Sequence, residues 1–372
     1  MHRTQGNCPV DRQIDRCAYR HTIPRPSQCS AKGQGGRQYA VQTVATAAQT
    51  RCEGEIIMSP IVSVVVCTRN RAECLRRCLD HLADQTAGSR EFEVIVVDNV
   101  STDATKNVCD SFATRLGIRY VLECELGIGH ARNAGLRAAQ GRFVAYVDDD
   151  VNIEQNWATE IIRIASEIQN LDGMGGPQRP YFTSRPPSWF KEKYACKMVK
   201  EGPCFLEPGQ VFTTTNAAVR RDVLVSLGGF DTNLGPVTGR TRFGEDTDLF
   251  LRLWQTNPGA RLYYSPRLAV RHLMHPDRLP VSAIFKRLFA IGIADSVLAC
   301  ARRGDHTPSR AFGVCMDISK TLLKALSRLP EYEKSGHWVM EELLSLPVLL
   351  GRLCGLLRIG VEDYRDYIRS TR

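Results

Sequence analysis

The chain has 372 residues, of which 43% are hydrophobic, so it can hold one large domain with a substantial core and an accessory region. Its formal charge of +9 lies mostly at the ends: residues 1–57 carry 8 Lys and Arg against 4 Asp and Glu, and residues 280–372 carry 14 against 10. The middle of the chain keeps only +1, which disfavours a main domain that binds nucleic acid and leaves open a basic tail on an anionic membrane.

The cysteines and the lack of export signals bear on the compartment. The 14 cysteines include no CxxC pair, and Cys67, Cys109 and Cys124 lie in or beside apolar segments where a thiol acts as a small hydrophobe. The chain opens without a signal-peptide pattern, and its most apolar stretch, residues 343–357, is interrupted by a proline and an arginine. We therefore expect a reducing, cytoplasmic location, with peripheral contact at the inner face of the membrane left open.

The first 57 residues lack sustained periodicity and large aliphatic side chains, which predicts a disordered leader. Order is expected to begin abruptly after Met58, so a start codon placed too early is one explanation of the leader.

Strands and helices alternate from Ile61 onward. We predict strands over residues 61–67, 92–99, 118–124 and 142–148, and helices over 71–85, 101–116 and 129–140. Ser101 or Thr102 is expected to cap the second helix. This succession requires crossover connections and predicts an α/β fold, with a Rossmann-like, mostly parallel sheet and flanking helices.

The character of the chain changes beyond residue 170. Long loops rich in Gly and Pro precede a second set of elements around residues 210–224, 244–255 and 260–272. Residues 280–372 read as amphipathic helices. We therefore predict a catalytic domain over residues 58–279 and a helical C-terminal appendage over residues 280–372.

Three consecutive carboxylates, Asp148, Asp149 and Asp150, end the predicted strand at 142–148. They repel one another and resist burial, so water or a cation must share the cluster. The motifs CTRNR and DNVSTD also follow strands, and parallel sheets bind ligands at the carboxyl ends of their strands. A hard divalent ion binds carboxylates together with substrate phosphates, so the pattern predicts a cation-dependent nucleotide site. A solvated acidic turn is the alternative for the aspartates alone.

Two common nucleotide-binding signatures are missing from the sequence. The turn after the first strand is CTRNR and contains no glycine, whereas the dinucleotide fold has GxGxxG there. The near match GIGHARNAG follows the third strand and has Arg132 in place of the last glycine, and no phosphate loop ends in GK[ST]. A nicotinamide or flavin enzyme is therefore disfavoured.

An ordered set of motifs between Ile61 and His272 resembles the catalytic domain of glycosyltransferase family 2, whose fold is called GT-A. The motifs are VSVVVCTRNR, FEVIVVDNVSTD, GHARNAG, FVAYVDDDV, GGF and GEDTDLFLRL. The resemblance implies inverting transfer of a sugar from a nucleotide-diphosphate donor, with a divalent metal, usually Mg²⁺ or Mn²⁺.

The resemblance also implies nucleotide contacts after the first two strands. Thr68 and Asn70 match the family's contacts to the base, and Asp98 matches its first acidic position. Asn99 stands where the family often has a second aspartate, which makes uridine less certain as the base. A turn with a helix cap is the alternative reading of Asp98 and Asn99.

Arg132, Asn133 and Gly135 match the family's helix beside the ribose and diphosphate. Arg132 would neutralise phosphate there, or else lie exposed on the surface, and Gly135 would let the helix approach closely.

In the acidic motif, the resemblance places two of the three aspartates at the ribose and the metal. We assign Asp150 to the metal and Asp148 to the ribose side, and we include Asp149 in the nucleotide-sugar site without a defined role. His272 stands where many members have a histidine near the metal, although a structural histidine fits equally; His275 is the weaker candidate.

The motif GEDTDLFLRL predicts a helix that begins near Glu245. Phe250 and Leu253 would share the face of Asp246, while Asp248 would pair with Arg252 on another face. A carboxylate near a helix N-terminus stays ionised, as a general base must. The resemblance makes Asp246 the catalytic base, and a helix cap is the alternative.

Taken together, we expect an inverting glycosyltransferase that acts on a saccharide or lipid-linked acceptor in cell-surface polysaccharide or glycolipid synthesis. A sugar-phosphate nucleotidyltransferase and a catalytically silent sugar-nucleotide-binding protein are the alternatives.

Overall fold

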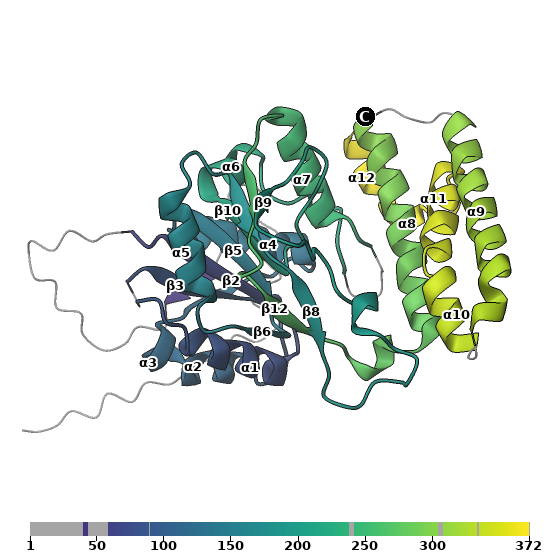
Figure 1. Ribbon diagram of the computed structural model, residues 1–372. Helices are drawn as coiled ribbons and strands as arrows, with labels where there is room; N and C mark the ends of the chain where they lie inside the picture. The colour runs from purple at the N-terminus through teal and green to yellow at the C-terminus, as the bar shows by residue number, and fades with distance from the viewer. Residues whose placement is uncertain are drawn as a thin grey trace, which may run out of the picture. The chain divides into compact units, whose positions relative to one another are not determined.

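The computed structural model describes residues 40–43, 59–88, 90–237, 242–303, 308–332 and 335–371 (Figure 1). Residues 39–372 form one compact unit. Most of the predicted leader, with Met58, lies outside the described residues. Within it, the described residues Ala40–Thr43 form strand β1, which pairs antiparallel with β4.

The predicted parallel strands are confirmed and form the centre of the main sheet. They are β2 (Val62–Thr68), β3 (Phe92–Asp98), β4 (Arg119–Leu122) and β5 (Phe143–Asp148), in the order β4-β3-β2-β5. Beyond β5 the sheet continues through strands of mixed direction, in the order β10 (Asn216–Arg220), β7 (Gly173–Gly175), β11 (Leu262–Tyr264) and β9 (Cys204–Phe205). The strand order reverses between β2 and β5, and such a switch point opens a crevice at the carboxyl ends of the strands.

The two-residue alternation of β2 explains the layers. Val64 and Val66 face one core, together with α1 (Ala72–Ala83), α2 (Thr105–Ser111) and α5 (Trp157–Glu167). Val65 faces the other core, which is built from α4 (Ile128–Ala138), α6 (Arg221–Ser226) and α7 (Glu245–Thr256). Helices therefore cover both faces, as the α/β prediction requires.

Gly135 permits one of these contacts. A Cβ atom at Gly135 would overlap with Val65 Cγ1, so α4 lies directly against β2. The close approach expected at this glycine is therefore made to the sheet.

The helix predicted over residues 101–116 is divided into α2 and α3 (Ala113–Leu116), and its predicted cap is wrong. The backbone N–H of Ser101 donates to Asp98 Oδ1 (2.7 Å), and the Ser101 hydroxyl oxygen accepts from the N–H of Asn70 (2.9 Å). Ala104 is the N-cap residue of α2, and the Oδ1 atom of the preceding Asp103 accepts from the backbone N–H of Thr105 at 3.1 Å.

The cysteines follow the expectation in part. Cys67 and Cys109 are free thiols, and burial raises the pKa of each to about 12. Cys124 is disulfide-bonded, so its interpretation as a small apolar thiol is wrong.

A second, three-stranded sheet joins distant segments beside the aspartates. Its strands are β6 (Val151–Ile153), β12 (Val270–Leu273) and β8 (Gln178–Tyr181), in the order β6-β12-β8. Because β6 follows the aspartates directly and His272 pairs with Val151, the histidine is held next to the acidic cluster.

The C-terminal region is helical, as predicted, and contacts the rest of the unit. Its helices are α8 (Val281–Arg303), α9 (Pro308–Arg328), α10 (Ser335–Glu342), α11 (Leu346–Leu356) and α12 (Arg365–Ser370). In the part of the chain that the structure describes, none of the helices is long and apolar enough to cross a membrane. Glu341 of α10 accepts hydrogen bonds from Lys191 and Tyr194. The bond from Lys191 contributes most to lowering the pKa of the Glu341 carboxyl to about 2.

A buried carboxylate joins the C-terminal helices to α7. Asp248 has a side chain with 0% exposure and pairs with Arg252 of its own helix at 2.8 Å, as the sequence predicted. It also accepts hydrogen bonds from Arg302 of α8 (Nε, 2.9 Å) and from the Tyr367 hydroxyl of α12 (2.8 Å). The start of α7 is held in the same way, because the N–H of Phe243 donates to Tyr364 Oη at 3.0 Å.

Replacing Asp248 by Asn is expected to lower the free energy of unfolding by about 3–5 kcal/mol, because two cations lose their buried counter-ion. Tyr367→Phe removes one hydrogen bond and should cost about 1 kcal/mol. Urea denaturation measures both. Asp366→Asn, in an exposed pair on α12, is the control and should change stability by less than about 1 kcal/mol. Equal stability of Asp248→Asn and the control would show that this network does not hold the helices together.

Candidate active site

The strand ends bring the candidate residues to one place. Cys67 of β2 lies opposite Asp148 of β5 in the parallel register, so Thr68 and the aspartates meet at the switch point. A cavity of about 760 Å³ opens there. Its lining includes predicted residues from six segments: Thr68, Asn99, Arg132, Asp148, Asp149, Asp150, Asp246 and His272.

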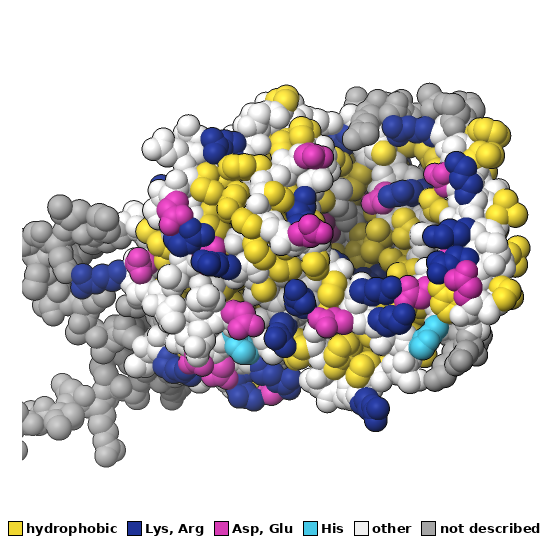
Figure 2. All heavy atoms as spheres, in the orientation of Figure 1, with side chains coloured by type: hydrophobic (Ala, Val, Ile, Leu, Met, Phe, Trp, Pro, Cys, Tyr) yellow, Lys and Arg dark blue, Asp and Glu magenta, His cyan; other side chains and the backbone are white. Residues whose placement is uncertain are grey.

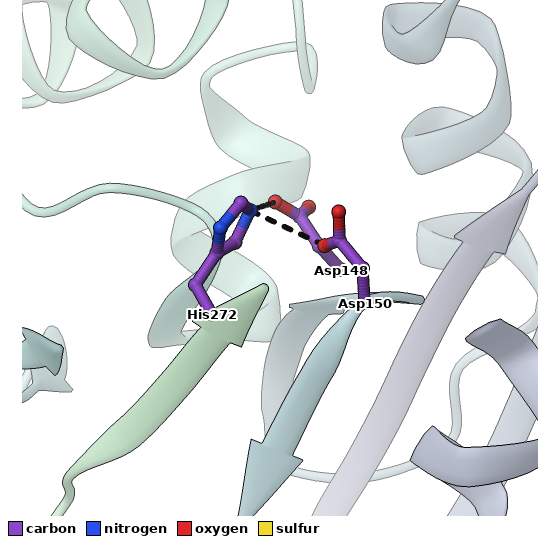
Figure 3. A group of neighbouring side chains, drawn as sticks. All are labelled: Asp148, Asp150 and His272. Atoms are coloured by element: carbon purple, nitrogen blue, oxygen red, sulfur yellow. Dashed lines mark ion pairs between the residues drawn. The ribbon is translucent and has the colours of Figure 1, made fainter. Parts of the chain in front are cut away.

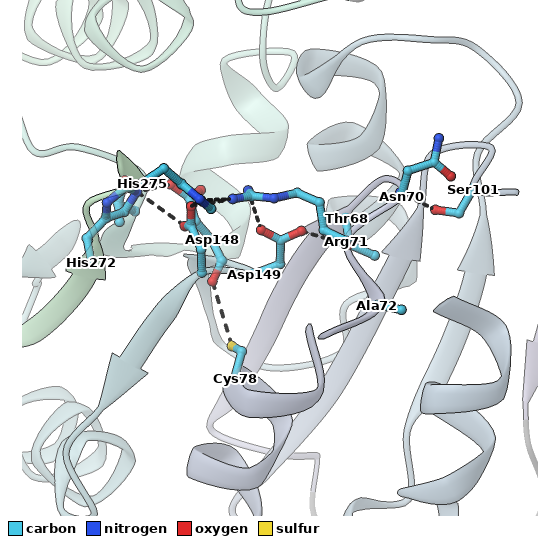
Figure 4. A network of polar contacts seen from close by, with 12 residues as sticks. Thr68, Asn70, Arg71, Ala72, Cys78, Ser101, Asp148, Asp149, His272 and His275 are labelled. Atoms are coloured by element: carbon cyan, nitrogen blue, oxygen red, sulfur yellow. Dashed lines mark hydrogen bonds and ion pairs between the residues drawn. The ribbon is translucent and has the colours of Figure 1, made fainter. Parts of the chain in front are cut away.

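Hydrogen bonds and ion pairs from neighbouring side chains make the crowding of the aspartates tolerable (Figure 4). Thr215 Oγ1 donates to Asp148 Oδ2 at 2.9 Å, and Thr68 Oγ1 donates to Asp149 Oδ2 at 2.7 Å. Asp149 and Asp150 are each 3% exposed, and burial raises the pKa of Asp149 to about 7 although Arg71 opposes this.

Arg71 is a site residue that the sequence reasoning missed. Its guanidinium bridges two carboxylates, with NH1 at 2.7 Å from Asp149 Oδ1 and NH2 at 2.7 Å from Asp150 Oδ2. It also lies 2.6 Å from His275 Nε2, which places the weaker histidine candidate at the edge of the cluster. Burial alone would raise the pKa of Asp150, but positive charges around it, including Arg71, lower it.

Asp148, Asp150 and His272 offer oxygen and nitrogen atoms that suit a metal ion (Figure 3). One ligand atom from each lies within 4.8 Å of the others, and His272 Nε2 is 3.2 Å from Asp150 Oδ1. Burial lowers the pKa of His272, which favours the neutral imidazole that can coordinate. Asp150 Oδ1 is buried and accepts no hydrogen bond from the described residues. These residues therefore fit a divalent cation, and Asp148 joins the predicted pair.

Asp246 lies in the first turn of α7, which begins at Glu245 as predicted. It is half-buried and lines the same cavity as the aspartates of β5. Among the described residues, no Lys, Arg or His forms an ion pair with its carboxylate; Oδ1 accepts only the N–H of Thr247, at 2.8 Å. The two halves of the predicted chemistry therefore share one cavity.

Arg132 is buried, so its alternative reading as a surface residue is wrong. Its NH1 is 2.8 Å from Glu245 Oε1, and its NH2 is 3.7 Å from Asp148 Oδ1. Burial, and then the charge of Asp246, raise the pKa of Glu245. Arg132 thus connects the acidic strand end to the start of α7.

Asn70, Asp98 and Asn133 are not among the described residues that line the cavity. Figure 4 shows Asn70 beside Ser101, away from the aspartates, and its Oδ1 accepts the N–H of Thr102. Asp98 accepts from Ser101 and from the Tyr120 hydroxyl, and Asn133 binds both backbone groups of Phe230. Their contacts are those of turns and loop anchors.

Asn99 lines the cavity, but its amide is committed to the backbone. Its Nδ2 donates to the carbonyls of Glu123 and Glu125, and its Oδ1 accepts the N–H of Gly127. The alternative reading of Asp98 and Asn99 as structural residues therefore accounts for every contact that they make here.

The cavity also contains three cations that no sequence motif marked: Lys197, Arg278 and Arg287. Arg278 follows β12 and Arg287 lies on α8, so the C-terminal region contributes to the site.

Comparison with known proteins shows similarity to glycosyltransferases. Residues 63–228 match the family described as glycosyl transferase family 2. Validoxylamine A glucosyltransferase of Streptomyces hygroscopicus subsp. jinggangensis is 45% identical over 94 residues, which cover 25% of this chain and 22% of that protein. The chain thus spans about a fifth of that relative. The succinoglycan biosynthesis protein ExoM of Rhizobium meliloti is 26% identical over 315 residues, 82% of this chain and 95% of that protein.

Among solved structures, the mannosyltransferase PcManGT from Pyrobaculum calidifontis, in complex with GDP-Man and Mn²⁺, has a TM-score of 0.54 at 19% identity. The likeness covers 81% of this chain and 88% of that one, and it supports the same α/β architecture. The ordered motifs, the fold and the family match lead to one conclusion: residues 63–228 form a glycosyltransferase family 2 domain with the GT-A fold.

Proposed function

We propose that this protein transfers a sugar from a nucleotide-diphosphate donor to a hydroxyl acceptor, with inversion at the anomeric carbon. The observation that carries the proposal is that Asp246 and the group Asp148, Asp150 and His272 line one cavity. A base and a site for the leaving diphosphate, set on two sides of a sugar, suffice for in-line displacement.

Asp246 is the proposed general base. It lies in the first turn of α7, and the lack of an ion pair with any described cation leaves its oxygens available to an acceptor hydroxyl. When the base removes the hydroxyl proton, the acceptor oxygen attacks the anomeric carbon from the side opposite the leaving diphosphate. Attack from that side inverts the configuration.

Asp148, Asp150 and His272 are the proposed holders of Mg²⁺ or Mn²⁺. A bound divalent ion would neutralise the negative charge that develops on the leaving diphosphate. Arg71 keeps Asp149 and Asp150 in place, and Thr215 orients Asp148, which we also place on the ribose side of the donor.

The acceptor is proposed to be a saccharide or lipid-linked molecule of cell-surface polysaccharide or glycolipid synthesis. ExoM, which is named for succinoglycan biosynthesis, aligns over nearly its whole length with this chain and supports this assignment.

Replacing Asp246 by Asn is expected to lower donor turnover by about 10²–10⁴-fold, because the variant lacks the group that accepts the proton. Nucleotide binding should be retained. Turnover is measured as nucleoside diphosphate release in a screen of nucleotide sugars, with and without Mn²⁺.

Asp222→Asn is the control, because that aspartate is 70% exposed on α6 and lies outside the cavity. It should keep full turnover. Full turnover by Asp246→Asn would remove this residue as the base, and lack of turnover by the unmutated protein with every donor would favour a silent binding protein.

Replacing His272 by Ala is expected to weaken Mn²⁺ binding at least about tenfold, since even changes around metal ligands cost about 10–100-fold. Isothermal titration with Mn²⁺ measures the affinity directly. His81→Ala, on α1 away from the cavity, should bind Mn²⁺ like the unmutated protein. Identical affinities of the two variants would exclude His272 as a ligand.

Peripheral membrane contact is proposed for one face of α9. Phe312, Leu323 and Leu326 share this face by their helical spacing and are 69%, 69% and 62% exposed, and the exposed Lys320 and Lys324 lie next to it on the helix. Figure 2 shows hydrophobic and basic side chains side by side on the surface of the helical region. The opposite face of α9 packs in the helical region, so the apolar face is free to enter an anionic lipid surface.

Replacing both Leu323 and Leu326 by Glu is expected to abolish cosedimentation with vesicles that contain phosphatidylserine. Val225→Glu, which changes an apolar residue of α6 that is 55% exposed, should leave cosedimentation intact. Equal recovery of the unmutated protein in the soluble and vesicle fractions would contradict membrane contact.

A further inference from the structure

Three cations in the cavity lack the counter-ions that their neighbours have. Arg71 pairs with Asp149 and Asp150, and Arg132 pairs with Glu245. Among the residues that the structure describes, no carboxylate forms an ion pair with Lys197, Arg278 or Arg287. The cavity therefore contains cations that are paired within the protein and cations that form no ion pair with a described carboxylate.

Lys197, Arg278 and Arg287 are close enough for their positive charges to repel one another. Burial, and then the charge of Arg287, lower the pKa of Lys197; burial, and then the charge of Arg278, lower the pKa of Arg287. Like charges held together and partly removed from water are unfavourable unless an anion joins them.

The place of this group in the cavity points to the reacting centre. Asp148 and Asp246 both act electrostatically on Lys197 and on Arg287. The guanidinium of Arg287 lies 5.6 Å from the centroid of the Phe243 ring, just before α7. An anion bound by Lys197 and Arg287 would thus share the cavity with the proposed base and the proposed metal ligands.

The fold holds these cations in position without neutralising them. Lys197 pairs through its backbone with Gln178 of β8, at 2.9 Å from the lysine N–H to the glutamine carbonyl. Arg287 lies on α8, and this helix packs closely against the start of α7. The close packing is seen at Gly244, just before α7, where an added Cβ atom would be only 2.8 Å from Leu298 Cδ1 of α8. Both side chains are therefore presented by fixed backbone.

We propose that Lys197, Arg278 and Arg287 form a binding site for a phosphate-bearing anion, completed by the C-terminal helical region. The inference rests on the proposed function for the identity of the anion, which is either the diphosphate of the donor or a phosphate on the acceptor. On this view residues 280–372 are a working part of the catalytic unit, because α8 supplies one of the three cations.

Arg287→Gln tests the site, and Lys286→Gln is its matched control, because Lys286 is the neighbouring cation of α8, exposed and outside the cavity. Affinities for pyrophosphate, UDP, GDP and geranyl phosphate are measured by isothermal titration on the full chain, at fixed ionic strength and without added metal. We expect Arg287→Gln to weaken phosphate-bearing ligands about 10–100-fold, the effect of losing one charged hydrogen bond, and the control to match the unmutated protein.

The ligands separate the two sources of the anion. A loss for pyrophosphate and the nucleoside diphosphates assigns the site to the donor, and a loss confined to geranyl phosphate assigns it to the acceptor. Equal affinities of Arg287→Gln and the control for all ligands, or no binding of any of them by the unmutated protein, would overturn the proposal. The Arg287→Gln variant could bind the phosphate-bearing ligands more weakly while the unmutated protein turns over no nucleotide sugar. That result would support the anion site and reject the proposed function.

Discussion

The repulsion among three adjacent carboxylates at the end of β5 is the constraint on which the rest of the site depends. Such a cluster is stable only if each charge meets a donor or a cation. The structure meets this need with Arg71 and Thr68 from the end of β2, Thr215 from before β10, and His272 from β12. These segments converge because β2 and β5 are neighbours at the switch point and because the small sheet holds β12 beside β6.

The second half of the site depends on the position of α7. Asp246 can face the aspartates only if the start of this helix is held, and two contacts from the C-terminal region hold it. Tyr364 accepts the N–H of Phe243, and Asp248 is locked between Arg302 and Tyr367. The predicted boundary between the catalytic domain and the helical appendage lies between residues 279 and 280. In the structure, the segments on both sides of this boundary belong to one compact unit.

The basic residues of the cavity differ in whether an acidic residue of the protein pairs with them. Arg71 and Arg132 serve the acidic residues of the protein itself, which leaves their charge largely neutralised. Lys197 and Arg287 have no such partner among the described residues, so their charge is available to whatever enters. The cavity combines the carboxylate of Asp246, the possible cation ligands Asp148 and Asp150, and positive charge that no described carboxylate pairs with. This combination suits the two substrates that we propose, an acceptor with a hydroxyl group and a donor with a diphosphate.

The sequence by itself determined the order of strands and helices, the parallel centre of the sheet and the place of the acidic cluster. These features follow from local patterns: the two-residue alternation of β2, the helical spacing of α7 and the rule that ligands meet the carboxyl ends of parallel strands. The helical spacing of α7 indicated that Asp246 points inward, whereas its role as the base and the place of His272 near the metal came from the resemblance to glycosyltransferase family 2. Only the tertiary structure decided that Asn70, Asp98 and Asn133 face loops, that Arg132 is buried, and that Arg71, Lys197 and Arg287 belong to the site. The physical reason is that these side chains are long or multiply hydrogen-bonded, so their partners are set by which distant segments the fold brings within a few ångströms, and no spacing along the chain encodes that distance.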